Sequence, residues 1–431
     1  MLPALPSWLV YPLLFVGFFI SFFFLILILK KDEKIHPTET FPDVSFVIPA
    51  RNVENCITRC VESIVKQDYK GKLNIVVVND ASEDKTAHIV KTLIKKYNSK
   101  VREIILLNRE KSQGKKAPVV NEGIKYVIKH LKTDFVAPVD ADTFITKNVL
   151  KNAIGAFEKD ELVMVVTAPL IPLQKNFLLR LQYVEYVMSN FYRELLGRVG
   201  SLCATPAFTV FKTEFFKEAG LYNEHTWTED FDMALRVKSH FYKIAYLKDK
   251  VYFIAPEKLG KLRTERVRWG HGTFQALLKD YPYMISPKYG AVGTFFLPIT
   301  VVLGLGLLML SLLLLIYAII YALLYTARSW SIGWRPILDF RISLFDLSIA
   351  ASDPKVVLGF FSILISVLFF VFARRYGKEK ISLLDYLVFF IPYIWFLAYT
   401  QLEGFIKYIF NLKMQWGHMH TDVDKKQKKH V

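Results

Sequence analysis

Uncharged and charged stretches divide this chain into segments of different character. Residues 8–29 carry no charged side chain, and the stretch ends at Lys30 and Lys31. A helix of 22 residues is long enough to cross a hydrocarbon core of about 30 Å, so the stretch predicts a membrane span. It lacks the basic lead and the small-residue cleavage site of a signal peptide. The two lysines predict that the chain after the span lies in the cytoplasm.

Between about residues 32 and 285 the charge density is ordinary, and short apolar runs alternate with helical patterns. The strand-like runs lie at residues 44–48, 75–78, 104–107, 135–139 and 164–167. Strands that alternate with helices are typical of units in which helices cover both faces of a parallel sheet. The pattern therefore predicts an α/β fold with a mostly parallel, doubly wound sheet.

Three more apolar stretches follow, at residues 291–325, 356–373 and 386–402. We interpret each as one span, the first with an interfacial lead-in, which makes four spans in all. Four spans return the C-terminal lysines to the side of the N-terminus, against the positive-inside tendency, unless a fifth span or an interfacial last segment intervenes. The predicted organisation is a transmembrane helix at 1–31, a cytoplasmic domain at 32–285, a membrane region at 286–411 and a basic, lipid-contacting tail at 412–431.

Composition narrows the class of protein. The chain has 431 residues, 53% hydrophobic and 22% charged, which excludes a disordered or collagen-like protein. Its formal charge of +17 fits an anionic membrane surface, nucleic acid or a polyanionic substrate such as a nucleotide sugar. A nucleic-acid function lacks a reader motif and would leave the spans unexplained. The three cysteines, Cys56, Cys60 and Cys203, lack the spacing of a metal site or a disulfide framework.

Carboxylates follow two of the predicted strands. Asp80 comes directly after an apolar strand, where open α/β sheets bind ligands at the carboxyl ends of their strands. Asp80 could instead cap the next helix, but Ser82 and Asp84 are better placed as caps, so we favour a ligand contact.

Asp140 and Asp142 end the strand at 135–139 and share one face of an extended segment. Two like charges at this spacing repel each other unless a cation or hydrogen-bond donors lie between them. Mg²⁺ prefers a few protein carboxylates together with phosphate oxygens. A D-x-D motif alone is weak, but its place at the end of a buried strand predicts a divalent-metal site.

Two further motifs carry charge on predicted helices. Thr228-Glu229-Asp230 opens an apolar-periodic helix, and as an isolated motif it favours a helix cap with acidic first-turn residues. The run from Glu265 through Arg266 and Arg268 to Trp269 has helical spacing. It could be a solvated basic face with its tryptophan at the membrane boundary, or a stacking surface with phosphate-directed cations. His271 follows, and a lone histidine is more often structural.

Taken together, these residues resemble the membrane-embedded family 2 glycosyltransferases, the group of the cellulose, chitin and hyaluronan synthases. The four signature elements stand in the family's order: Asp80, Asp140-Ala141-Asp142, Thr228-Glu229-Asp230 and Glu265-Arg266-Val267-Arg268-Trp269. The last begins 35 residues after Asp230, as in the family. The segment from Lys116 to Asn121 is similar to the family's K-A-x-A-x-N. Glu265 replaces the family's glutamine, and the small-residue stretch at 200–205 matches its turn below the acceptor imperfectly.

The resemblance implies a GT-A fold, in which a seven-stranded mixed sheet between helices binds a nucleotide sugar at its carboxyl edge and transmembrane helices flank the domain. It assigns four residues to the nucleotide sugar: Asp80, Lys116, Asp140 and Arg268. It assigns Asp140 and Asp142 to Mg²⁺ or Mn²⁺ and makes Asp230 the general base. It places four residues near the acceptor: Glu229, Glu265, Trp269 and, in the imperfect turn, Cys203.

The function implied is an inverting, metal-dependent transfer from a UDP-sugar or another nucleotide-diphosphate sugar to a growing β-linked polysaccharide at the cell membrane. A single transfer to a lipid acceptor is the alternative, favoured by Glu265 and by the small number of spans. A non-catalytic scaffold would not need the carboxylates, all of which are present. Three C-terminal spans are few for a polysaccharide channel, which leaves room for accessory subunits or a homo-oligomer.

Overall fold

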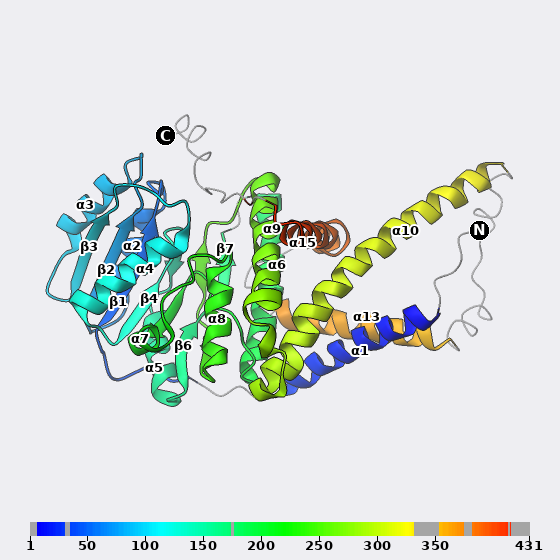
Figure 1. The fold of residues 1–431 in the computed structure, drawn as a ribbon, viewed down its shortest axis with the longest axis horizontal. Coiled ribbons are helices and arrows are strands. Elements are labelled where there is room, and N and C mark those ends of the chain that lie inside the picture. The colour runs from blue at the N-terminus through cyan, green and yellow to red at the C-terminus, as the bar shows by residue number, and fades with distance from the viewer. Residues whose placement is uncertain are drawn as a thin grey trace.

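The computed structural model of the chain describes residues 7–30, 35–173, 176–331, 353–374, 382–412 and 414. A sheet-containing domain lies at one end of the molecule, and helices extend away from its other end (Figure 1).

The core of that domain is a seven-stranded sheet in the order β3-β2-β1-β4-β8-β6-β9. Its strands are β1 Val44–Ala50, β2 Leu73–Asn79, β3 Arg102–Asn108, β4 Phe135–Pro138, β6 Val163–Thr167, β8 Thr209–Lys212 and β9 Lys243–Tyr246. Strand β8 runs antiparallel to β4 and β6, whereas the other neighbouring pairs are parallel. The five predicted strands and the mixed, mostly parallel sheet are therefore confirmed.

Helices cover both faces of the sheet, so its inner strands are buried on both sides. In β1, Phe46 and Ile48 belong to a core cluster with α2 Ile57–Val65, α3 Thr86–Tyr97 and α5 Val149–Lys159. Val47 points the other way, into a cluster with α4 Lys116–Tyr126, α7 Thr213–Ala219 and α8 Glu229–Ser239. This alternation explains the continuous apolar runs in the sequence, since each strand fills two cores.

A second, three-stranded sheet lies beyond the carboxyl end of β4. Its strands are β5 Thr143–Ile145, β7 Leu170–Pro172 and β10 Val251–Phe253, with β10 in the middle. The backbone N–H of Ile254 donates to the carbonyl of Asp142 at 3.2 Å. The small sheet therefore holds the segment that carries the D-x-D motif.

Long helices complete the molecule. Helix α6 Phe177–Arg198 and helix α9 Leu259–Gln275 pack beside the sheet domain, and α15 Ile394–Ile409 packs along α9 (Figure 1). Helices α1 Ser7–Leu29, α10 Gly304–Ser331 and α13 Pro354–Ala373 extend outward, with α1 against α13. Shorter helical segments are η1 Val127–Leu131, η2 Ala276–Asp280, η3 Pro282–Met284, η4 Pro287–Tyr289, η5 Val292–Leu303, α14 Leu383–Val388 and η7 Phe389–Tyr393.

The four apolar stretches of the sequence are helical: they form α1, η5 with α10, α13, and η7 with α15. In the parts of the chain that the structure describes, we found no helix with both the length and the apolar character needed to cross a membrane. The four spans therefore stay a prediction from the sequence. Apart from Leu412 and Met414, the predicted basic tail lies outside the described residues.

Candidate active site

The parallel strands bring two of the predicted carboxylates to the same edge of the sheet. Strands β1, β2 and β4 point the same way, so Asp80 after β2 and Asp140 beyond β4 both lie at their carboxyl ends. The N–H of Asp80 donates to the carbonyl of Ala50 at 2.8 Å, and the N–H of Asp140 donates to that of Ala207 at 3.1 Å. Their backbone positions are therefore fixed by the sheet and by the loop before β8.

Asp80 is held by a cation that the sequence did not reveal. Its side chain is buried, with 4% of the residue exposed, and the Nη1 atom of Arg109 donates to its Oδ1 atom at 2.9 Å. The hydroxyl of Ser112 donates to the other carboxylate oxygen. Arg109 also pairs with Glu122, with 3.1 Å between Nε and Oε2. Arg109 directly follows β3, so its place at the same sheet edge was a signal that could have found it.

Lys116 joins two of the predicted motifs. It is the first residue of α4, and its Nζ atom lies 2.5 Å from Oδ1 of Asp140 and 3.4 Å from Oε1 of Glu229. Burial opposes the ammonium charge most strongly, but Asp140 and Glu229 more than offset it and raise the pKa of Lys116. The strand-end carboxylate and the start of α8 therefore meet at one cation.

The D-x-D pair lies beside this cation. Burial raises the pKa of Asp140 to about 6; Lys116 acts against the rise, and the negative charge of Asp142 adds to it. The hydroxyl of Thr143 donates to Oδ1 of Asp142 at 3.3 Å. Asp142 is half-buried.

The D-x-D pair supplies two carboxylates for a metal ion. Among the described residues, no three His, Cys, Asp or Glu side chains gather closely enough to hold a metal by themselves. Two carboxylates nevertheless fit Mg²⁺ or Mn²⁺, because Mg²⁺ takes one or two protein carboxylates and completes its shell with phosphate oxygens and water. Burial is the main cause of the raised pKa of Asp140, and the negative charge of Asp142 adds to it, so a cation bound beside the pair would favour the ionised form of Asp140.

Asp230 lies in the first turn of α8. Its Oδ1 atom accepts from the N–H of Phe231 at 2.9 Å, and the hydroxyl of Thr205 donates to its carbonyl at 2.6 Å. Burial and the neighbouring charge of Glu229 raise the pKa of Asp230. A carboxylate with a raised pKa and some access to solvent is suited to accept a proton.

The helix-cap interpretation of this motif is met only in part. Thr228 occupies the N-cap position of α8, and acidic residues fill the first turn. The Thr228 side chain makes no capping hydrogen bond, and its buried hydroxyl has no partner among the described residues. Helix α9 packs closely against this side chain, because a Cβ atom on Gly272 of α9 would come closer than 3.0 Å to the Thr228 side chain.

Helix α9 reaches the same loop through Arg268. Its Nη1 atom donates to the carbonyl of Trp227 at 2.7 Å, directly before the Thr228-Glu229-Asp230 motif. The positive charge of Arg268 also lowers the pKa of Asp230, against the larger effect of burial. Trp269 packs half-buried against the core cluster that contains α2 and α5.

Arg266, within the Glu265–Trp269 motif of α9, is a buried arginine to which the sequence assigned no role of its own. Arg266 is 2% exposed, and its Nε and Nη2 atoms donate to both carboxylate oxygens of Glu185 in α6 at 3.0 and 3.1 Å. It also pairs with Glu265, and its guanidinium carbon lies 4.0 Å from the centre of the Trp269 ring. Burial raises the pKa of Glu265, whereas Arg266 and Arg268 lower it.

Cys203 lies in the loop before β8, inside the core cluster that contains α4 and α8. Burial raises the pKa of its thiol to about 12. The structure thus brings Lys116, Asp140, Glu229 and Asp230 together. It places Asp80 at the same edge with Arg109, and Glu265 and Trp269 at the packed boundary of α6 and α9.

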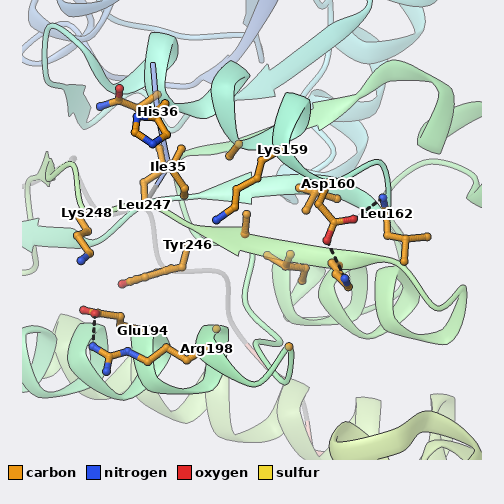
Figure 2. A pocket seen from close by; sticks show the side chains of 18 of the residues that line it. Ile35, His36, Lys159, Asp160, Leu162, Glu194, Arg198, Tyr246, Leu247 and Lys248 are labelled. Carbon is orange, nitrogen blue, oxygen red and sulfur yellow. Dashed lines mark hydrogen bonds and ion pairs between the residues drawn. The ribbon is translucent and has the colours of Figure 1, made fainter. Parts of the chain in front are cut away.

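A pocket of about 950 Å³ lies away from these carboxylates, and none of the predicted site residues lines it. It is bounded by the ends of α5 and α6 and by β9 (Figure 2). In it, Arg198 pairs with Glu194 at 2.7 Å, and Asp160 pairs with Lys243 at 2.7 Å. Arg198 also donates to the carbonyl of Lys30, directly after α1, at 2.7 Å. This lining holds α1 to the domain.

Comparison with known proteins assigns the family. The profile described as "Glycosyl transferase family 2" matches residues 45–220, and the one described as "Glycosyl transferase family group 2" matches residues 135–400. The second covers more than half of the chain, so the chain belongs to the family 2 glycosyltransferases. The resemblance predicted from the motifs is confirmed.

Several relatives are named poly-β-1,6-N-acetyl-D-glucosamine synthases. One from Staphylococcus epidermidis is 28% identical over 268 residues, which is 61% of this chain and 61% of the relative. Another, from Staphylococcus aureus strain MSSA476, is 27% identical over 259 residues, 59% of this chain and 60% of the relative. The match thus spans about three fifths of the length of these relatives.

A solved structure shares the fold across nearly the whole chain. The mannosyltransferase PcManGT from Pyrobaculum calidifontis, determined in complex with GDP-Man and Mn²⁺, has a TM-score of 0.59 and 16% identity. The likeness covers 94% of this chain and 99% of that one. It confirms the predicted α/β fold of the GT-A type with a mixed sheet.

Proposed function

We propose that this protein is an inverting, metal-dependent membrane glycosyltransferase that transfers a sugar from a nucleotide-diphosphate sugar to a growing β-linked polysaccharide. The observation that carries the proposal is the meeting of Asp140, Lys116 and Glu229 beside Asp230 at the carboxyl edge of the sheet. The names of the relatives support a polymer of N-acetylglucosamine and hence a UDP-sugar as donor.

In the proposed mechanism, Asp230 accepts the proton of an acceptor hydroxyl. The hydroxyl oxygen forms a bond to the anomeric carbon as the bond from that carbon to the diphosphate oxygen breaks. One such displacement inverts the anomeric configuration, so an α-linked donor gives a β-linked product. Burial near Glu229 favours the neutral carboxyl, so the proton taken from the acceptor is held more firmly than by an ordinary aspartate.

Lys116 and Arg268 supply positive charge for the donor phosphates. The diphosphate would compete with Asp140 and Glu229 for the ammonium of Lys116, which contacts both carboxylates through one nitrogen atom. Asp80, fixed by Arg109, would accept hydrogen bonds from the nucleotide. Asp140 and Asp142 would hold Mg²⁺ or Mn²⁺, which when bound neutralises the leaving diphosphate.

The acceptor side rests on three parts of the chain. Glu229 and Trp269 would face the acceptor saccharide, with Glu265 beside them and Cys203 in the loop below. Glu265 is paired with Arg266, so its replacement of the family's glutamine does not place an unpaired charge at the acceptor. This pairing weakens the case for a lipid acceptor that Glu265 had raised.

We further propose that the catalytic domain lies on the cytoplasmic side of the cell membrane and that the chain is multi-pass. The support is in the sequence: four long uncharged stretches, with Lys30 and Lys31 after the first. Accessory subunits or a second copy of the chain would complete a path for the polymer.

The test is a transfer assay on membranes that contain the full chain. Radiolabelled UDP-N-acetylglucosamine and GDP-mannose are supplied in parallel, with Mg²⁺, with Mn²⁺ and with EDTA, and the product is sized. We expect a labelled polymer from the UDP-sugar, abolished by EDTA and restored by metal. A product that extracts wholly into organic solvent with one sugar per lipid would establish the lipid glycosyltransferase instead. No dependence on metal would contradict the assignment of Asp140 and Asp142.

A further inference from the structure

A second cavity, of about 750 Å³, borders the loop before α8 and includes none of Thr228, Glu229 and Asp230. Three parts of the chain line it: the loop before α8, the end of α9 with η2, and the end of α15 with the residues that follow. The lining includes Trp227, His271, Gln275, Lys279 and Tyr408. Its volume is in the range of small-molecule binding sites.

One polar side chain that lines this cavity lacks a hydrogen-bond partner in the described part of the chain. His271 is 7% exposed, and its Nδ1 atom is buried without a hydrogen-bond partner among the described residues. Burial, with a smaller effect of Lys407, lowers the pKa of His271, so the ring is neutral at neutral pH and offers one donor and one acceptor. Buried polar atoms in folded proteins are nearly always satisfied, so an orphaned one beside a cavity points to a ligand.

Aromatic rings flank this histidine. The ring centre of His271 lies 6.2 Å from that of Trp227 and 5.7 Å from that of Tyr408, and both pairs meet edge to face. Gln275 and Lys279 add polar groups at the rim. A sugar ring presents C–H groups on a face and hydroxyls around its edge. Aromatic side chains combined with a few hydrogen-bonding groups match that chemistry better than they match a lipid chain.

The position of the cavity links it to the reaction. Trp227 lies three residues before Asp230, and its carbonyl accepts the hydrogen bond from Arg268. Glycines let α9 and α15 approach closely here, because a Cβ atom on Gly404 would come within 2.8 Å of the backbone N of His271. The cavity is therefore a fixed feature of the α9–α15 boundary, and Trp227 connects it to the loop that leads to the proposed base.

We propose that this cavity is an acceptor subsite that binds a saccharide unit of the growing chain away from the reacting hydroxyl, with Trp227 and Tyr408 as packing surfaces and the His271 ring as its hydrogen-bonding group. The proposal rests on the proposed function, because it assumes a saccharide acceptor. It adds that the enzyme prefers acceptors long enough to reach this subsite.

The test measures acceptor length dependence in the full chain. β-1,6-linked N-acetylglucosamine oligosaccharides of two to six units serve as acceptors, and KM is measured for each with the wild type, His271→Leu and His271→Asn. The wild type is expected to show a KM that falls as the acceptor lengthens. His271→Leu should raise KM for the long acceptors roughly 3- to 10-fold, the scale of one hydrogen bond. In this variant the ratio of the KM for long acceptors to the KM for short acceptors should be near one. His271→Asn, which places a polar atom near Nδ1, should restore part of the preference.

A matched pair on α15 tests the packing surface. Tyr408→Ala removes a lining side chain, whereas Phe410→Ala removes an exposed ring that is not in the lining. Only the first should lower the length preference. Calorimetric binding of the tetrasaccharide, without donor, gives a second readout that needs no turnover, and thermal unfolding checks that the variants are folded.

The outcomes separate the two proposals. If the wild type transfers to no saccharide of any length, the proposed polysaccharide function fails. If it does transfer but its KM is independent of length, or if His271→Leu weakens binding of short and long acceptors equally, the function stands and the subsite is wrong.

Discussion

Lys116 and Arg266 each contact two carboxylates, the first beside the proposed catalytic residue and the second between α6 and α9, and they are held in different ways. Lys116 is 26% exposed in its side chain and meets Asp140 and Glu229 through a single nitrogen atom, at 2.5 and 3.4 Å. A lysine ammonium is a point charge with rotatable donors. Its contacts can be exchanged one at a time when another anion arrives.

Arg266 is nearly inaccessible by comparison. It donates two hydrogen bonds to the carboxylate of Glu185, contacts Glu265 and lies against the Trp269 ring. The hydroxyl of Tyr393 donates to the same carboxylate of Glu185 at 2.6 Å. An arginine fork fixed on both sides leaves no contact to exchange. A cation that is loosely held can exchange its carboxylates for another anion, as the proposed site requires, whereas a buried cation with all three nitrogen atoms hydrogen-bonded acts as a structural frame.

The largest expected effect is on the frame. Arg266→Met should lower the free energy of unfolding by about 3–5 kcal/mol, because it leaves two carboxylates in a buried place without their cation. Chemical unfolding of the purified chain measures this, with Arg266→Lys as a milder control that retains the charge. Lys116→Met, measured in the same way, should cost much less. Equal losses for the two methionine variants would contradict the distinction between frame and site.

The next largest effect is on turnover, without a change in donor binding. Asp230→Asn removes the proposed proton acceptor, so turnover should fall by roughly 10²-fold or more while binding of the nucleotide sugar is retained. Initial rates and equilibrium binding of the donor measure the two quantities separately. Asp160→Asn, which alters an ion pair at the far sheet edge, is the control and should leave both near the wild-type values. Normal turnover in Asp230→Asn would restore the helix-cap interpretation.

A smaller effect concerns the metal. Asp142→Asn removes one of the two proposed ligands, so nucleotide-diphosphate affinity should fall about 10-fold or more in the presence of Mg²⁺ or Mn²⁺, because loss of even an outer-shell group of a metal site costs about that much. Without metal, the affinity of the variant should equal that of the wild type. Calorimetric titration with UDP, with and without metal, makes the comparison. A matching loss in both conditions would mean that Asp142 binds the nucleotide without a metal.

The smallest expected effect is a shift in pH dependence. Asp230 must be ionised to accept a proton, and its raised pKa means that kcat/KM falls at a higher pH than for an ordinary aspartate as the solution is acidified. Glu229→Gln removes the neighbouring negative charge that helps to raise this pKa. The acidic limb should therefore move to lower pH, by less than about one unit. A limb that stays in place or moves upward would show that Asp230 does not govern it.

The sequence predicted much of the sheet because strands β1, β2, β4 and β6 lie inside it, are buried on both faces and therefore appear as apolar runs. Strand β3 is an edge strand that is only partly buried, but it carries an apolar run as well. Strand β9 Lys243–Tyr246, at the other edge, is short and begins with a lysine. Strands β5, β7 and β10 are three residues each, too short for an alternation to be visible. Strand β8 is four residues long and is recognisable only by its two antiparallel neighbours.

The site divides in a similar way. Carboxylates at strand ends were predictable, because parallel strands deliver them to one edge whatever the rest of the chain does. The cations that hold the proposed site residues were harder to find. The pairing of Arg266 with Glu185 joins residues 81 positions apart on two helices, and no local pattern encodes it. Arg109 and Asp80 are 29 positions apart, and their pairing can be predicted only once β2 and β3 are known to be neighbours.

The close approach of Gly272 to Thr228 also has a meaning for how this sequence can vary. Any side chain at position 272 would displace the residue that precedes Glu229 and Asp230. Gly260, at the other end of the same helix, has open space where its Cβ would lie. In a library randomised at both positions and selected for transfer activity, survivors should keep glycine at 272 and accept most residues at 260. The tolerance of α9 to mutation would then differ between its two ends, and the intolerant end would be the one that borders the proposed site.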